Sequence, residues 1–134
     1  MTRPFDHEKL DVYREAMRFV VWVHGALEKI PKRSSVYDQL ERASTSIPLN
    51  IAEGNGKFTG SDRCRFFDMA RGSALESAAC LDVAAAKGQL SAPEAASGKE
   101  MLLHIVSMLV GLIKANSATR VHEGEAGYGD ADGD

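Results

Sequence analysis

The sequence predicts an all-α protein, an antiparallel up-down-up-down bundle of four helices. Four segments of about 18 to 27 residues repeat apolar residues at the three- and four-residue spacing of a helix that buries one face. Short links containing Gly, Pro and Ser separate these segments, and short links make consecutive helices antiparallel neighbours. No segment shows the apolar–polar alternation of a strand. We therefore expect residues 1–120 to form the bundle and residues 121–134 to form an acidic, Gly-rich disordered tail.

The first two helices are separated by Pro31. We expect the first helix over about residues 8–30, because the proline that follows has no N–H with which to continue it. The second helix should cover about residues 36–53, after a serine cap in the turn. Gly54 is then well placed as its C-terminal cap.

The last two helices have equally clear boundaries. A loop with three glycines, residues 54–60, precedes the third helix, which we expect over about residues 62–87 after a serine or threonine cap. Gly88 ends that helix. The segment Ser91-Ala-Pro-Glu94 has the pattern of a capping box and opens a fourth helix to about Ala118.

A polar stripe on the second helix runs beside an apolar one. The polar stripe comprises Arg42, Ser46, Asn50 and Glu53, and the apolar stripe comprises Ala43, Ile47 and Ile51. If the second and third helices are antiparallel about Lys57, Arg42 lies level with Ser73 and one turn from Glu76, and Ala43 lies opposite Gly72. We expect a buried network of these polar residues that fixes the helix register. The alternative is a ligand site.

The fourth helix has an excess of apolar residues. In Met101–Ile113, ten of thirteen residues are apolar, which leaves almost no polar face. This run is shorter than the about 20 residues that a membrane span needs, so no membrane association is expected. The first helix shows a similar surplus around Phe19–Val23. We interpret these surpluses as faces for self-association.

The charges divide between the body and the tail. The net charge is −3, and the tail from Val121 onward carries five acids and no Lys or Arg, so residues 1–120 carry +2. One end of the predicted bundle gathers basic residues beside the Gly-rich loop, whose amides could also meet phosphates. The candidate nucleic-acid-binding residues at this end are Lys9, Lys57, Arg63, Arg65 and Lys114. A solvated charged rim, or a surface that docks a protein partner, is the alternative.

The sequence gives little indication of a catalytic or metal-binding site. His24 and His104 fall in apolar stripes and are expected to be hydrogen-bonded core histidines. No Glu-x-x-His pair of a di-iron bundle occurs, and no P-loop spacing. Cys64 and Cys80 are about 24 Å apart on one helix, too far to form a disulfide. We therefore expect no enzyme activity, no cofactor and no metal, in a reduced protein of the cytoplasm.

Several short motifs together resemble a known family. They are Leu10-Asp-Val-Tyr13 with Ala16, Pro31-Lys32, Arg42-Ala43, Ser46-Ile-Pro-x-Asn-Ile-Ala-Glu-Gly54, Arg65-Phe66, and Ala70-x-Gly-Ser73 with Glu76. This pattern resembles the four-helix-bundle proteins encoded in intervening sequences of bacterial 23S ribosomal RNA genes. The fold is also similar to accessory proteins of diversity-generating retroelements. The resemblance implies a homopentamer and suggests an RNA or DNA partner, whereas the alternative function is an oligomeric scaffold that binds a protein.

Overall fold

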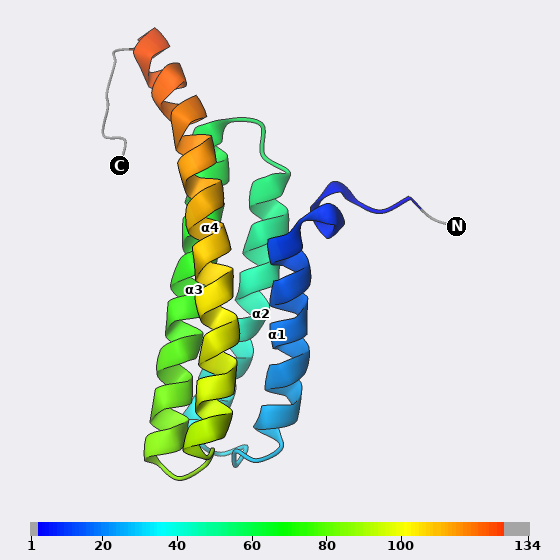
Figure 1. Ribbon diagram of the computed structural model, residues 1–134, viewed down its shortest axis with the longest axis vertical. Coiled ribbons are helices and arrows are strands. Elements are labelled where there is room, and N and C mark those ends of the chain that lie inside the picture. Colours follow the sequence, from blue (N-terminus) through cyan, green and yellow to red (C-terminus); the bar gives the residue numbers. More distant parts are fainter. Residues whose placement is uncertain (1–2, 128–134) are drawn as a thin grey trace.

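Four long helices make up most of the chain. The computed structural model describes the backbone of residues 3–127 and the side chains as far as Ser117. A short 3₁₀ helix, η1 (Asp6–Lys9), precedes α1 (Asp11–Leu27), α2 (Ser35–Asn55), α3 (Gly60–Ala86) and α4 (Ala92–Gly127). Each helix runs opposite to the one before it (Figure 1). Within residues 3–127 there is no strand, so the predicted all-α bundle is confirmed.

The helices surround a single apolar core. The helix pairs in contact are α1–α2, α2–α3, α3–α4 and α1–α4, so each helix touches two neighbours. All four helices contribute side chains that are fully buried. The largest of these are Phe19, Leu40, Ile47, Ile51, Phe67, Leu81, Leu102, Ile105 and Leu109. The predicted apolar stripes therefore face one another across the bundle axis.

Side-chain caps begin three of the helices as the sequence predicts. Ser34 Oγ accepts from the Val36 amide at 3.4 Å, and Thr59 Oγ1 accepts from the Asp62 amide at 3.1 Å. Ser91 and Glu94 form a reciprocal capping box with bonds of 3.1 and 2.8 Å. After α3, Gly88 adopts a φ of 73°, which glycine adopts without a steric cost.

Three helix ends in α1 and α2 differ from the prediction, and one of them is the end of α1 at Leu27 instead of near residue 30. The first helix begins at Asp11 instead of near residue 8, because Leu10 is extended, with φ −79° and ψ 130°, and separates it from η1. Gly54 is not a cap, because α2 continues to Asn55. An ideal Cβ at Gly54 would lie 2.9 Å from the Cβ of Phe66, so the missing side chain serves close packing of α2 on α3.

The fourth helix is longer than predicted. It continues to Gly127, past the expected end near Ala118. The sequence from 118 to 127 contains no proline, and residues such as Ala, Arg and Glu favour a helix. The structure thus continues α4 into the first part of the segment expected to be a disordered tail, and residues 128–134 lie outside the described part of the chain.

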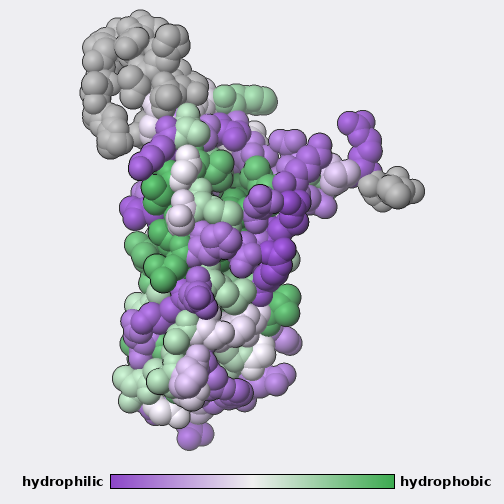
Figure 2. All heavy atoms as spheres, viewed as in Figure 1, coloured by the Kyte–Doolittle hydropathy of each residue, from purple (hydrophilic) through white to green (hydrophobic). Residues whose placement is uncertain are grey.

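Much of α4 is apolar and yet accessible. Within Ala92–Ser117, the most apolar stretch of 18 residues has a mean hydropathy of 1.4, and 22% of that stretch is buried. Within the described part of the chain, α4 is the one helix long and apolar enough to cross a membrane, judged only by length and composition. Leu109 belongs to the core, whereas Leu103 is 72% exposed. Apolar residues gather along the side of α3 and α4 in Figure 2.

The two histidines expected in the core are both on the surface. His24 lies near the end of α1 and His104 in the middle of α4, and both side chains are exposed. Each histidine lies outside the buried stripe of its helix. That stripe contains Val23 and Ala26 in α1, and it contains Leu102 and Ile105 in α4. An apolar sequence neighbourhood was a poor guide here, because α4 is apolar around most of its circumference.

Candidate nucleic-acid interface

One end of the bundle is formed by the α2–α3 loop, η1 and the later part of α4 (Figure 1). All five predicted basic residues belong to these elements or to the first turns of α3: Lys9, Lys57, Arg63, Arg65 and Lys114. Lys9, Arg65 and Lys114 are exposed, whereas Lys57 and Arg63 are half-buried. The five residues thus lie at one end, but they do not have equivalent surroundings.

Arg63 holds the loop to the bundle. Its Nη1 donates to the carbonyl oxygen of Asn55 at 2.8 Å and to that of Lys57 at 3.3 Å. Its Nε donates to Asn116 Oδ1 on α4 at 2.8 Å, and its guanidinium lies over the Phe67 ring at 5.6 Å. Because most of its donors are engaged with protein acceptors, Arg63 anchors the loop, and its role as a phosphate ligand stays a prediction.

Lys57 and Arg65 share one aromatic ring. Lys57 Nζ lies 5.1 Å and Arg65 Cζ 4.9 Å from the centroid of the half-buried Phe66 ring. These distances are typical of cation–π contacts. Lys57 Nζ is also 3.7 Å from Glu53 Oε2, a separation at which a surface ion pair contributes little. Both cations are therefore positioned by Phe66 while their charges remain accessible to a ligand.

Phe58 is the residue at this end that the sequence analysis missed. Its side chain is 100% exposed, more than any other large apolar residue whose side chain is described. It stands between Lys57 and Thr59 in a loop otherwise made of Gly and polar residues. An aromatic residue next to a basic one in such a loop was the available signal, since paired cations and aromatics are typical of single-strand binding.

Acidic residues reduce the positive charge of this end. Asp6 Oδ2 accepts from Asn55 Nδ2 at 3.2 Å, which ties η1 to the end of α2. Asp62 lies in the first turn of α3, where its charge complements the helix dipole. The excess positive charge of one chain at this end is consequently small, and repetition in an oligomer would be needed to build a strong field.

The predicted polar network is present only in part. Ser46 Oγ and Ser73 Oγ lie 2.9 Å apart across α2 and α3, and Asn50 Nδ2 donates to both the carbonyl oxygen and the Oγ of Ser46 at 2.9 Å. Arg42, Glu53 and Glu76 are exposed instead of buried. Among the described ion pairs there is none between Arg42 and Glu76.

The helix register explains this difference. Ser73 pairs with Ser46, one turn along from Arg42, because α2 extends through Gly54 and packs there against Phe66 and Phe67. Gly72 does not face Ala43 closely either, since a Cβ added at Gly72 would have no neighbour within 4 Å. The register counted about Lys57 was therefore wrong by about one turn.

An open hollow lies beside the three hydrogen-bonded residues. It has a volume of about 490 Å³ and is lined by Glu41, Arg42, Thr45, Ser46, Leu49 and Asn50. All of these residues belong to α2, so the hollow is a concave stretch of one helix surface. A small-molecule site normally encloses most of its ligand. The hollow on α2 would enclose little of a ligand, so its geometry does not favour the alternative of a ligand site.

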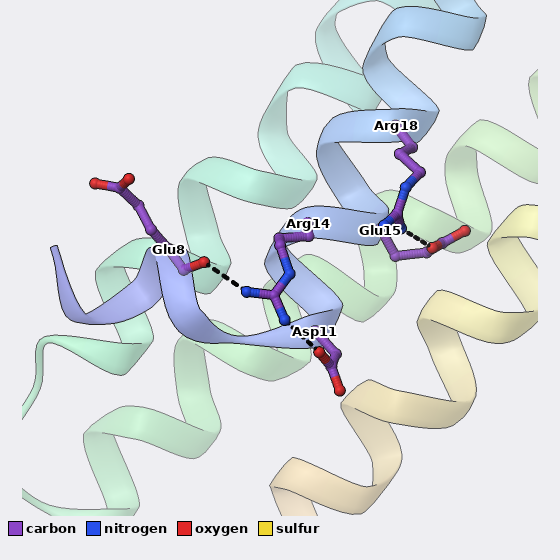
Figure 3. Close-up of polar contacts among 5 residues, drawn as sticks. All are labelled: Glu8, Asp11, Arg14, Glu15 and Arg18. Atoms are coloured by element: carbon purple, nitrogen blue, oxygen red, sulfur yellow. Dashed lines mark hydrogen bonds and ion pairs between the residues drawn. The ribbon is translucent and has the colours of Figure 1, made fainter. Parts of the chain in front are cut away.

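Two further arginines lie on α1, outside the predicted basic set. Figure 3 shows Arg14 between the carbonyl oxygen of Glu8 and the carboxylate of Asp11, with Nη1 3.2 Å from Glu8 O. Arg18 pairs with Glu15 in the next turn. Because both arginines have acidic partners one turn away, this surface is a balanced charged face.

The histidines, cysteines and acidic residues with described side chains do not form a metal-binding cluster. Among the residues with described side chains, no three His, Cys, Asp or Glu residues come together to hold a metal. Cys64 and Cys80 are free and buried. Burial, and secondarily the carboxylate of Glu76, raises the pKa of the Cys80 thiol. A buried thiol that keeps its proton is a poor nucleophile.

The fold and the charged end define a four-helix-bundle protein with an accessible cationic and aromatic loop. The chain belongs to the 23S rRNA-intervening sequence protein family, whose sequence model matches residues 8–111. A solved structure with the same fold is a protein of unknown function from the S23 ribosomal protein family of Bacteroides thetaiotaomicron VPI-5482. Its TM-score is 0.72 at 21% identity, over 77% of this chain and 98% of that one. A comparison with curated proteins gives no match.

Proposed function

We propose that this protein is a non-enzymatic, homo-oligomeric helical bundle that binds structured RNA or another nucleic acid through the end formed by the α2–α3 loop. The observation that carries the proposal is the pair Lys57 and Arg65, two accessible cations positioned on one aromatic ring. Phosphate contacts from Lys and Arg provide most of the affinity of such complexes.

Lys9 and Lys114 extend this surface. Both are exposed, on η1 and α4 respectively, and lie at the same end as the loop. The amides of Gly56 and Lys57 already donate to carbonyl oxygens at the end of α2, so the cationic side chains, and not the loop backbone, would meet the phosphates. The proposed interface therefore combines cations from the loop, α3, η1 and α4.

Self-association is the second part of the proposal. Val21 on α1 and Leu103 on α4 are 70% and 72% exposed in the single chain, and most of the apolar stretch of α4 is not buried. Large exposed apolar patches usually mark interaction surfaces. An assembly of five chains, as the family resemblance implies, would repeat the weak positive charge of one bundle end around a ring.

A salt titration with matched variants tests the nucleic-acid proposal. The full-length protein should shift a stem-loop RNA, and log affinity should fall linearly as log salt rises. The double variant Lys57→Glu/Arg65→Glu should lose binding and the salt dependence. The control Lys32→Glu/Arg33→Glu makes the same charge change in the exposed α1–α2 turn, at the opposite end, and should bind nearly as well.

The outcomes separate the two candidate functions. Equal losses from both double variants would mean that net charge, and not this end, drives binding. If the full-length protein shifts no RNA or DNA at low salt, the nucleic-acid function is wrong. The protein-binding scaffold then becomes the better proposal. A hollow at the first turns of α1 is a candidate contact surface, and it is lined by Glu8, Tyr13, Arg14, Met17, Arg18 and Val21.

A further inference from the structure

We infer that Phe58 is a stacking platform for an unpaired base, so that the nucleic acid bound at this end presents a single-stranded segment. The inference rests on the proposed function and goes beyond it by naming the form of the ligand. Its starting observation is that Phe58 is 100% exposed at the tip of the α2–α3 loop. Leaving a phenylalanine uncovered forgoes the stabilisation that burial of such a side chain contributes.

The loop that carries Phe58 is held firmly on both sides. Arg63 binds the carbonyl oxygens of Asn55 and Lys57, immediately before Phe58. Thr59, immediately after it, caps α3 through the Asp62 amide at 3.1 Å. The same Arg63 reaches Asn116 on α4 at 2.8 Å, so the loop is tied to a third helix. The ring is thus presented by a fixed backbone, which lowers the ordering cost of binding.

A second aromatic, Phe66, and two cations lie within eight residues of Phe58 in the sequence. Lys57, adjacent to Phe58, and Arg65 both lie over Phe66 within 5.1 Å of its centroid. Single-strand binding proteins combine aromatic rings that stack bases with cations that follow the backbone. Here Phe58 would supply the stacking face, and Lys57 and Arg65 would meet the flanking phosphates.

The chemistry of the loop favours an unpaired strand over other partners. In a duplex the faces of each base are covered by the neighbouring bases, so an exposed phenylalanine ring cannot stack on them. Bases in loops and at strand ends are open to such stacking. A membrane is a poorer candidate, because Phe58 is the only large apolar residue in residues 54–60. One such side chain, flanked by Gly, Asn, Lys and Thr, provides too little apolar area for a stable anchor.

The experiment compares single-stranded and duplex RNA of the same sequence with the full-length protein. Phe58→Ala should weaken binding to the single strand by about 5- to 150-fold, the range that corresponds to the loss of one stacked base. Binding to the duplex should stay within about twofold, and the salt slope should not change because no charge is removed. Phe58→Trp should restore binding to the single strand. Phe5→Ala removes another exposed phenylalanine, which stacks on His7, and should have little effect.

Each contrary result has a distinct meaning. If Phe58→Ala binds the single strand as tightly as the parent, the stacking inference is wrong and the charge-based function stands. Equal losses on single strand and duplex would show that Phe58 only supports the loop, which also overturns stacking. If the parent binds neither RNA at low salt, the proposed function and this inference both fail. If the parent binds phosphatidylglycerol vesicles and Phe58→Ala does not, Phe58 contacts membranes. That result would overturn both the nucleic-acid function and the stacking inference.

Discussion

Trp22 of α1 packs directly against Gly98 of α4. An ideal Cβ at Gly98 would lie 2.5 Å from Cη2 of Trp22 and 2.7 Å from Cδ1 of Leu81, a residue of α3. The Trp22 ring is stacked on Phe19, with centroids 5.9 Å apart, so it cannot move aside without losing that contact. Three helices therefore converge at a position that only glycine fits.

The first prediction follows from this contact. Gly98→Ala should lower the free energy of unfolding by about 1 to 3 kcal/mol, the usual cost of overpacking a core. Gly72→Ala is the matched control, since a Cβ there meets nothing within 4 Å. It should be neutral or raise stability by up to about 1 kcal/mol, because alanine is the better helix former. Urea unfolding of both variants measures the difference, and equal effects would contradict the packing.

The second prediction separates two arginines that are two residues apart. Arg63→Ala should destabilise the protein by about 2 kcal/mol or more, because it removes charged hydrogen bonds that join the loop to α4. Arg65→Ala should change stability by less than about 0.5 kcal/mol, since this side chain is exposed. Thermal unfolding measures both. A stable Arg63→Ala variant would show that the loop does not need its anchor.

The third prediction concerns the α2–α3 contact. Ser73→Ala should cost about 1 kcal/mol, because Ser46 loses its partner at 2.9 Å in a half-buried site. Arg42→Ala should cost less than about 0.5 kcal/mol, as expected for an exposed residue without an ion pair. Guanidinium unfolding distinguishes them. A large loss of stability in Arg42→Ala would instead indicate a buried Arg42–Glu76 ion pair, which is absent among the described ion pairs.

The fourth prediction is a pH dependence due to Cys80. Burial, and then Glu76, raises the pKa of this thiol above its ordinary value of 9.0, so the folded protein holds the proton more tightly than the unfolded chain does. The resulting stabilisation is complete below pH 9.0 and is lost as the pH rises toward the folded pKa. In this range the free energy of unfolding of the parent should fall by up to about 1.4 kcal/mol more per pH unit than that of Cys80→Ala. Parallel stability curves for the two proteins between pH 8 and 11 would contradict the shift.

The fifth prediction tests self-association at the exposed face of α4. Light scattering of the full-length protein should give a mass near five chains, as the family resemblance implies. Leu103→Glu should reduce the mass while leaving the helical circular dichroism intact, because Leu103 is exposed within one chain. Leu109→Glu should unfold the chain instead, since it places a charge in the core. A monomeric parent at micromolar concentration would refute the assembly.

The sequence alone determined the helices, most of their boundaries and the general location of the basic end. Caps such as Ser34, Thr59 and Ser91 act on amides two or three residues away, so a local pattern is enough to find them. The short links then determine antiparallel order, which places the α2–α3 loop near η1 and the later part of α4. These features need no knowledge of how the helices rotate against one another.

The tertiary structure alone decided how the helices rotate and slide, and with that the role of each side chain. The observed register of α2 and α3 differs from the predicted one by about one turn, or about 5.4 Å. Ser73 therefore pairs with Ser46 and not with Arg42. The same packing made Arg63 an anchor and left Phe58 uncovered, although both are close to Lys57 in sequence. Register and rotation depend on the interlocking of large and small residues, such as Trp22 with Gly98, across several helices at once. No local pattern contains that information, because each contact joins residues that are distant in the chain.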